Sequence, residues 1–269
     1  MGNSVFHCVS CFSDTFSYIL FIIVVESSFK PYNVEESDER IKEILKTEDK
    51  EYEELDEIPP RDKLTYNNGF YVYCTALFVD VRNSSILPDK YKRPTLARIY
   101  RSYISEVVAL LNGNSDCKEI NIHGDSVWGI FNTRSKTDID DVFSTSASIS
   151  SVVNLLNCRL KKKGIEPISI GIGLDYGRAL MIKAGYKGSG INDVVWMGDV
   201  VNKASKLCSY GNRSYNDCET MVSSVFFSNL NEENKKLLNY NYFRQCYHGD
   251  IINKHIDNWV KERCEKQPR

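Results

Sequence analysis

The chain has 269 residues, a length typical of one catalytic domain with terminal extensions. Hydrophobic residues make up 42% of the chain and charged residues 26%, which excludes collagen-like, coiled-coil and wholly disordered proteins. The net charge of −2 excludes a protein that binds nucleic acid through a strongly basic surface.

Residues 1–60 are predicted to form an N-terminal extension with one acidic helix. The segment 34–58 is rich in charged residues and has sparse apolar positions, Ile41 and Leu55 among them. It ends before Pro59-Pro60, which cannot continue a helix.

The apolar run 18–25 is eight residues long, whereas a membrane-spanning helix needs about 20. It also lacks the flanking residues of a signal peptide. We therefore predict a cytoplasmic protein without a membrane span.

The nine cysteines are scattered, several of them within apolar runs, and this pattern predicts reduced, mostly buried thiols. His7, Cys8 and Cys11 cluster near the N-terminus, but zinc normally has four ligands and no second cysteine pair follows at zinc-finger spacing.

Residues 70–230 are predicted to form the catalytic domain, and residues 231–269 a C-terminal extension of helix and strand. The elements expected in the catalytic domain are a strand at 71–81, a helix at 94–112, a hairpin of strands at 119–123 and 126–131, a helix at 140–162, strands at 168–177 and 178–185, and a helix at 198–209. The order βαββαβ predicts an α+β fold, a ferredoxin-like palm with the helices on one face of the sheet.

Two carboxylates are expected to meet at one edge of this sheet. Asp80 ends a hydrophobic strand, and Asp125 lies in the turn of the hairpin that packs beside it. Such a pair suits two Mg²⁺ or Mn²⁺ ions, which prefer oxygen ligands and assist attack at phosphorus. Taken singly, Asp80 could instead cap the following turn, and Asp125 could be an ordinary turn residue.

Two further segments carry polar groups that suit a phosphate ligand. Asn83, Ser84 and Ser85 follow Asp80, and a turn of small polar residues presents backbone N–H groups to phosphate oxygens. Asn202 and Lys206 are four residues apart on a predicted helix, so both project from one face. By themselves the last two residues could equally be a solvated polar pair.

Four segments resemble, in order and spacing, class III nucleotidyl cyclases: FVDVRNSS, INIHGDSVWGIF, IGIGLDYGRAL and VVWMGDVVNKASKL. The resemblance spans more than half of the chain. It implies that Asp80 and Asp125 bind two divalent ions and that the backbone carbonyl of Val81 contributes to one of them. It also implies that Asn202 stabilises the transition state. Lys206 stands where most members have an arginine, which keeps the positive charge but loses the bidentate fork.

The positions that read the purine in this family differ here. Adenylyl cyclases have a lysine four residues before the hairpin aspartate and an aspartate three residues before the helix-opening glycine, and guanylyl cyclases have Glu and Cys. Asn121 and Val195 occupy these substrate-binding positions in this chain. A chain that keeps the metal-binding aspartates but lacks the residues that bind the purine base resembles the bacterial Pycsar pyrimidine cyclases. This resemblance implies synthesis of cyclic UMP or cyclic CMP in antiphage defence, and a product that acts on a separate effector protein.

The amide of Asn121 can both donate and accept hydrogen bonds, so it suits either uracil or cytosine. UTP is the expected substrate and CTP the alternative, because the resembling family implies uridylate cyclases as its commoner kind. His123, Arg178 and Lys187 are further possible ligand contacts. The resemblance also implies a homodimer in which Asp80 of one chain meets Asn202 of the other. A degenerate cyclase that binds nucleotides without turnover is the alternative from another functional class, and a palm-domain polymerase or dinucleotide cyclase is a second enzymatic alternative.

Overall fold

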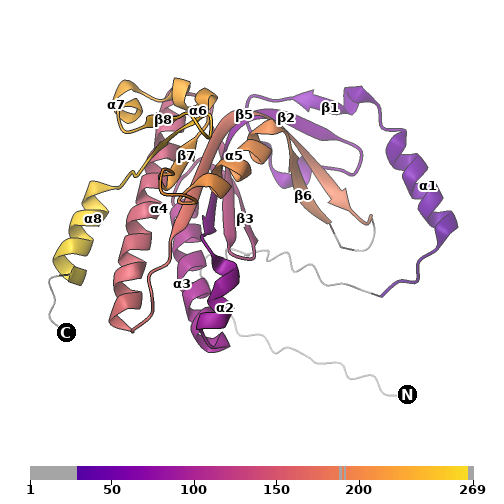
Figure 1. The fold of residues 1–269 in the computed structure, drawn as a ribbon. Coiled ribbons are helices and arrows are strands. Elements are labelled where there is room, and N and C mark those ends of the chain that lie inside the picture. Colours follow the sequence, from indigo (N-terminus) through magenta and orange to yellow (C-terminus); the bar gives the residue numbers. More distant parts are fainter. Residues whose placement is uncertain (1–28, 188–189, 191, 266–269) are drawn as a thin grey trace, which may run out of the picture.

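The computed structural model describes residues 29–187, 190 and 192–265 of the chain (Figure 1). Within this part, nine strands form one sheet in the order β3-β4-β2-β5-β7-β9-β8, with β1 beside β2 and β6 beside β5. The strands are β1 (Tyr52–Glu54), β2 (Gly69–Val81), β3 (Cys117–His123), β4 (Ser126–Asn132), β5 (Ile170–Gly185), β6 (Asn192–Met197), β7 (Thr220–Val222), β8 (Asn239–Asn241) and β9 (Cys246–Gly249). The helices are α1 (Val34–Leu45), α2 (Leu87–Lys90), α3 (Arg93–Asn112), α4 (Lys136–Lys162), α5 (Asp199–Tyr210), α6 (Ser224–Asn229), α7 (Glu232–Lys235) and α8 (Lys254–Val260).

The predicted βαββαβ order is confirmed by β2, α3, β3, β4, α4 and β5. The predicted hairpin is also confirmed: His123 pairs with Ser126 across the two-residue turn Gly124-Asp125. Gly124 has φ +63°, the left-handed region that a glycine occupies at little cost. Helix α4 begins four residues earlier than predicted, because Ser135 and Asp138 form a capping box at its start.

The prediction of one helix over 34–58 is wrong, because α1 ends at Leu45. The chain then enters β1, which pairs in parallel with β2, with Tyr52 opposite Gly69. Leu55 packs against the hydrophobic core instead of lying on a helix. Pairing with a long neighbouring strand thus overrides the helical propensity of a Glu-rich segment.

The prediction of two strands at 168–177 and 178–185 is also wrong. They form the single strand β5, which pairs with β2 without interruption from Ile170 opposite Val81 to Ile182 opposite Gly69. Gly177 lies in the middle of this ladder, where hydrogen bonds to β2 keep the chain extended. The hairpin partner of its second half is β6.

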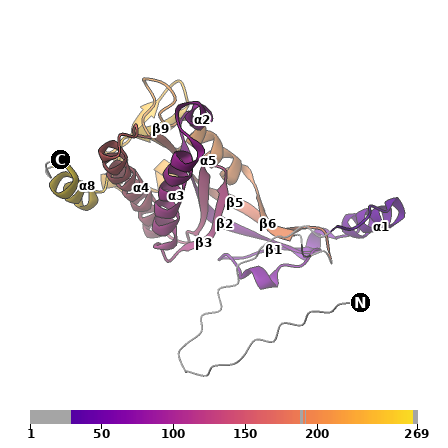
Figure 2. The same cartoon turned by 90° about the horizontal axis from the view of Figure 1, so that it is seen from below.

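The sheet is covered on both faces, contrary to the predicted single helical face. Helices α3 and α4 pack on the face of β2 that carries Leu77 and Val79 (Figure 2). Helix α5 packs on the opposite face, against Cys74 and Ala76. The alternation of side chains along β2 explains the division, since odd-numbered residues face one layer and even-numbered residues the other.

Helix α5 approaches the sheet closely because β5 has glycines beneath it. A Cβ atom on Gly173 would lie 2.2 Å from the backbone of Ala204 and of Cys208, and one on Gly171 would lie 2.6 Å from the Cys208 carbonyl oxygen. A side chain at either position would therefore push the helix away. The close approach of α5 to β5 therefore requires glycine at these two positions.

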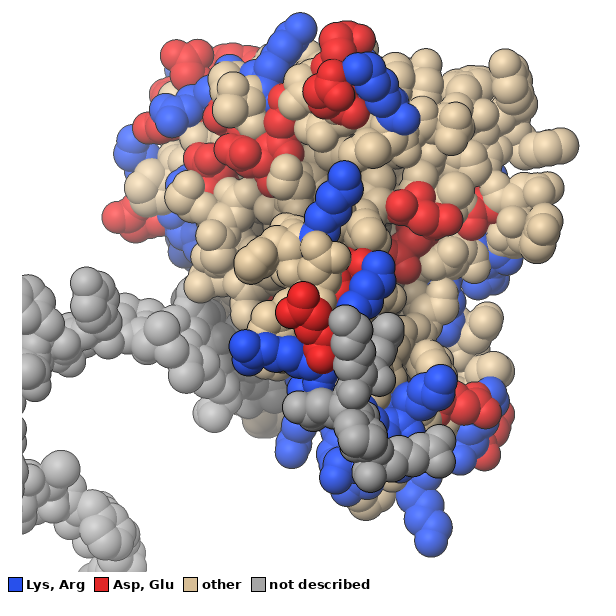
Figure 3. All heavy atoms as spheres, turned by 90° about the vertical axis from the view of Figure 1, so that its left-hand side faces the viewer, with Lys and Arg blue, Asp and Glu red and all other residues tan. Residues whose placement is uncertain are grey.

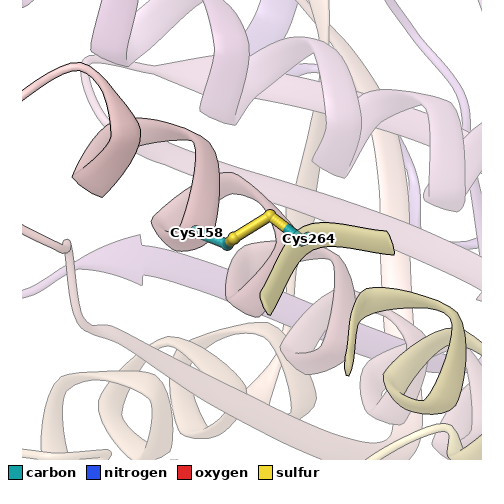
Figure 4. The surroundings of a disulfide bond; sticks show 2 residues. All are labelled: Cys158 and Cys264. Carbon is teal, nitrogen blue, oxygen red and sulfur yellow. A yellow bond between two sulfur atoms is a disulfide. The ribbon is translucent and has the colours of Figure 1, made fainter. Parts of the chain in front are cut away.

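A disulfide joins Cys158 of α4 to Cys264, in the π-helical turn Lys261–Glu265 that continues α8 (Figure 4). The prediction that the cysteines are reduced thiols is therefore wrong for this pair. The two residues are 106 positions apart in the sequence, and it is the packing of α8 along α4 that brings their Cα atoms to 6.4 Å. The cysteines that are free in the described part are Cys74, Cys117, Cys208, Cys218 and Cys246.

Charged side chains of both signs are interspersed among uncharged residues on the face seen in Figure 3, the left-hand side of Figure 1. Helix α1 projects from the body and has no buried residue (Figures 1 and 2). No helix in the described ranges is long and apolar enough to cross a membrane. The predictions for His7, Cys8, Cys11 and the apolar run 18–25 lie outside the described residues.

Candidate active site

Asp80 and Asp125 lie together at one end of the central strands. Asp80 is the second-last residue of β2, and β4 runs antiparallel to β2 with Val127 opposite Val79. The turn that precedes β4 therefore lies beside the end of β2, which places the two carboxylates within electrostatic contact. Burial, together with the charge of Asp125, raises the pKa of Asp80 to about 6, although Arg82 acts to lower it.

Arg82 is a member of this site that was not among the predicted residues. Its side chain is 5% exposed and forms an ion pair with the Asp80 carboxylate. Its Nη1 also donates a hydrogen bond to the carbonyl oxygen of Ser209 at 3.1 Å, in the last turn of α5. Arg82 follows Asp80 by two residues at the end of a strand. Residues two apart on a strand share one face, so this spacing could have predicted the contact from the sequence.

The donor set at Asp80 and Asp125 suits a hard divalent cation. One oxygen of Asp125 is buried and has no hydrogen-bond partner within the described chain. Two adjacent carboxylates, one with an oxygen free to coordinate, are typical of Mg²⁺ sites, in which substrate phosphates and water complete the shell. The described residues contain no cluster of three or more His, Cys, Asp or Glu side chains that could hold a metal alone.

The turn after Asp80 exposes backbone groups beside the carboxylates. Asn83 has φ +55°, a left-handed conformation that asparagine tolerates better than most residues. It begins the short 3₁₀ turn Ser84–Ile86, which a hydrogen bond from the Ile86 amide to the Asn83 carbonyl closes at 3.1 Å. The first amides of such a turn have no partner within it. Val81 is buried in the core, so only its backbone can reach a ligand.

Two tyrosines of α3 lie near the carboxylates and were not among the predicted site residues. Burial raises the pKa of Tyr100 and of Tyr103, and the charges of Asp80 and Asp125 add to the shift in both. The Tyr103 hydroxyl is buried without a hydrogen-bond partner among the described residues. The Tyr103 ring itself lies in the hydrophobic core.

Asn202 and Lys206 are exposed on α5, on the side opposite to the residues that face the sheet. No contact in the described part of the chain links either of them to Asp80 or Asp125. The structure thus brings the two carboxylates together but does not bring the α5 pair to them within one chain.

Asn121 and an aromatic pair share the sheet face that carries Asp80. Trp128 lies directly opposite Asn121, and Phe78 lies directly opposite Trp128. The two rings stack with their centroids 5.0 Å apart. The amide nitrogen of Asn121 is buried and has no hydrogen-bond partner in the described chain. Val195, on β6, is 38% exposed and offers an apolar surface.

The three further candidates lie in different surroundings. His123 is exposed at the end of β3, next to the Gly124-Asp125 turn. Arg178 forms two-point hydrogen bonds with Glu54 of β1 and stacks on the Tyr71 ring at 3.6 Å. Lys187 forms an ion pair with Glu43 of α1 at 2.8 Å. The last two thus hold parts of the N-terminal extension.

Comparison with known proteins identifies the family. The chain is 40% identical over 257 residues to a uridylate cyclase of Gulbenkiania mobilis, an alignment that covers 88% of this chain and 99% of the relative. The chain belongs to the uridylate cyclase family. A uridylate cyclase of Treponema porcinum is 36% identical, over 86% of this chain and 82% of the relative. As a member of this family the chain is an enzyme, a nucleotide cyclase of the lyase class.

The fold of this cyclase is that of the class III enzymes, which confirms the predicted fold class. A solved class III adenylyl cyclase-like ATP-binding protein from Pseudomonas aeruginosa superposes with a TM-score of 0.63 at 18% identity, over 86% of this chain and 50% of that one. No model of a known protein family matches the chain.

Proposed function

We propose that the protein converts UTP to 3′,5′-cyclic UMP and pyrophosphate. The relatives that cover most of the chain are uridylate cyclases. The observation that carries the chemistry is the adjacency of Asp80 and Asp125 at the end of β2, next to the 3₁₀ turn Ser84–Ile86. In this proposal the two carboxylates and the Val81 carbonyl hold two divalent ions, Mg²⁺ or Mn²⁺, and Asn83, Ser84 and Ser85 receive phosphate oxygens.

The reaction forms one phosphorus–oxygen bond and breaks another. The ribose 3′ oxygen attacks the α-phosphorus, its proton leaves to solvent, and the bond to the bridging oxygen of the β-phosphate breaks to release pyrophosphate. Divalent ions supply charge neutralisation for the attacking oxygen and the leaving group. Asn202 orients the ribose or the α-phosphate by amide hydrogen bonds, and Lys206 neutralises charge that develops on a phosphoryl oxygen.

The residues at the base-reading positions favour a pyrimidine. The buried amide of Asn121 can pair with the O4 and N3 edge of uracil, and Val195 offers an apolar wall. The same amide, rotated, could pair with the N4 and N3 edge of cytosine, which keeps CTP as the second candidate. The names of the relatives favour UTP.

The active site is completed in a head-to-tail homodimer. Asn202 and Lys206 project away from the sheet that holds Asp80 and Asp125, so a second copy is needed to bring the two sets together. Each chain carries both sets, and a symmetric dimer would have two equivalent sites. By its resemblance to the Pycsar cyclases, we propose that the product is a second messenger of antiphage defence that acts on a separate effector protein.

The decisive experiment supplies ATP, GTP, CTP and UTP at equal concentration with Mn²⁺ and resolves the products by mass. Cyclic UMP should dominate. Dominant cyclic CMP would change only the choice between pyrimidines, whereas dominant cyclic AMP or cyclic GMP would overturn the assignment of the base. Nucleotide binding without release of pyrophosphate would identify a degenerate sensor.

The shared site has a test of its own. Asp80→Asn and Asn202→Ala should each be inactive, and mixing them should restore activity, because one of the two sites in a heterodimer is then intact. Two variants of the same set, Asp80→Asn and Asp125→Asn, provide the control, since their heterodimers have no intact site. Absence of recovery after demonstrated subunit exchange would contradict the shared site.

A further inference from the structure

Arg61 ties together two edge strands of the sheet. It lies in the 3₁₀ turn Arg61–Lys63, before β2. Its Nε donates a hydrogen bond to Glu119 Oε1 at 2.8 Å, its Nη2 donates to Glu119 Oε2, and its Nη1 donates to Asp193 Oδ1 at 3.4 Å. Glu119 belongs to β3 and Asp193 to β6, and each of these strands pairs with a single neighbour in the described sheet. The guanidinium therefore connects strands that the described backbone ladder does not pair.

The contact with Glu119 is more than a surface ion pair. The Glu119 side chain is 3% exposed, whereas that of Arg61 is 41% exposed. Separating a buried carboxylate from its partner costs a large part of the folding free energy. The ion pair with Arg61 therefore favours the position of β3 in which Glu119 is neutralised. Because both carboxylate oxygens are engaged, the pair fixes the orientation of the strand as well as its distance.

The two carboxylates stand next to the two base-reading positions. Glu119 precedes Asn121 by two residues, and Asp193 precedes Val195 by two. Side chains alternate along a strand, so each carboxylate shares a face with the site residue that follows it. Glu119, on the same face of β3 as Asn121, and Asp193, on the same face of β6 as Val195, thus both contact the Arg61 guanidinium.

We propose that Arg61 is a positioning residue for nucleobase recognition, which it serves by clamping β3 to β6. This inference rests on the proposed function. The amide nitrogen of Asn121 is a buried donor without a hydrogen-bond partner in the described chain, as expected of a side chain that hydrogen-bonds to a ligand. Its discrimination between bases depends on where β3 holds it. β3 pairs with a single strand in the described sheet, so the Arg61 contact is a second constraint on its position.

The experiment measures selectivity, which is the ratio of kcat/KM for UTP to kcat/KM for CTP, in Arg61→Lys and Glu119→Gln. Lysine keeps the charge but cannot bond both carboxylate oxygens in the same geometry, and glutamine keeps the shape of Glu119 without its charge. Because both substrates are measured on one preparation, the ratio does not depend on the fraction of folded enzyme. Arg134→Lys is the matched control, since the Arg134 side chain forms an exposed ion pair with Glu57, a residue of the N-terminal segment that also contains Arg61.

We expect selectivity to fall by about tenfold in both variants and to be unchanged in Arg134→Lys. The Mn²⁺ concentration for half-maximal activity should stay within about twofold of the wild-type value, because Asp80 and Asp125 are not touched. Unchanged selectivity with lower thermal stability would show that Arg61 only stabilises the fold. That result would overturn the inference while leaving the proposed function intact. A wild-type enzyme that prefers a purine triphosphate would instead overturn both.

Discussion

Asp80 is held between a like charge and an opposite one. Its pKa of about 6 means that, relative to the unfolded chain, the folded chain without metal favours the protonated form. Above that pH the charged carboxylate therefore destabilises the metal-free fold. A divalent ion would remove this penalty, as would a neutral side chain of the same shape.

We predict that Asp80→Asn and Asp125→Asn each reduce turnover at least about 100-fold without loss of folding. Asp80→Asn should also unfold at pH 7, without divalent ions, at a temperature no lower than that of the wild type, because asparagine lacks the unfavourable charge. The measurements are pyrophosphate release and thermal unfolding, with Asp89→Asn, an exposed carboxylate of α2, as control. Substantial activity in either variant would contradict the metal assignment.

The Tyr103 hydroxyl is a second residue with an unusual environment, since it is buried and unpartnered. Tyr103→Phe should leave the metal-free protein as stable as the wild type or more stable by about 1 kcal/mol, because an unsatisfied buried hydroxyl is unfavourable. Urea unfolding measures this difference. A loss of stability would mean that the hydroxyl has a partner in solution, such as a buried water molecule.

The sequence predicted the meeting of Asp80 and Asp125, because each is tied to the end of a strand with a clear pattern. It did not predict Tyr103, since a tyrosine at helical spacing has the same pattern whether or not its hydroxyl has a partner. The ion pair between Arg178 and Glu54 was not predicted either, because Glu54 belongs to a segment predicted as helix.

At the scale of elements, α5 depends on the two glycines beneath it. Gly173→Ala should lower the free energy of unfolding by about 1–3 kcal/mol, because a Cβ there would meet the α5 backbone at 2.2 Å. It should also abolish turnover, since α5 carries Asn202 and Lys206. Denaturant unfolding and the cyclase assay check both effects.

Gly177→Ala is the matched control on the same strand. Its Cβ would lie 3.6 Å from the Val200 Cβ, an ordinary van der Waals distance. Stability and turnover should therefore stay close to wild type. Equal damage from both substitutions would mean that β5 rejects any side chain in this stretch, and that the packing of α5 is not the cause.

The sequence predicted elements well where the local pattern and the packing agree. Helix α3 has a proline in its first turn and buried residues at helical spacing, and the hairpin of β3 and β4 has a two-residue turn of its own. The prediction failed where pairing with a strand distant in the sequence determines the structure. β1 is a strand because it pairs with β2, and β5 continues past Gly177 because β2 pairs with it as far as Ile182. Such partners are not visible in a window of sequence.

At the scale of the whole molecule, the disulfide links α4 to the C-terminal end of the described chain. A link that spans about 100 residues can stabilise the fold by roughly 4 kcal/mol, mainly by restricting the unfolded chain. Reductant should therefore lower the guanidinium chloride concentration at which half of the wild-type protein is unfolded, and it should have no such effect on Cys264→Ser. Cys218→Ser, which removes a free thiol, should respond to reductant like the wild type.

The same disulfide also divides the chain into two parts. The covalent ring that it closes contains β5, β6 and α5, and therefore Val195, Asn202 and Lys206. Asp80 and Asp125 lie outside the ring. A protease that cuts once between Cys158 and Cys264 would leave two fragments still joined, and they would separate on a gel only after reduction. A cut between Asp80 and Asp125 would release the N-terminal fragment under either condition.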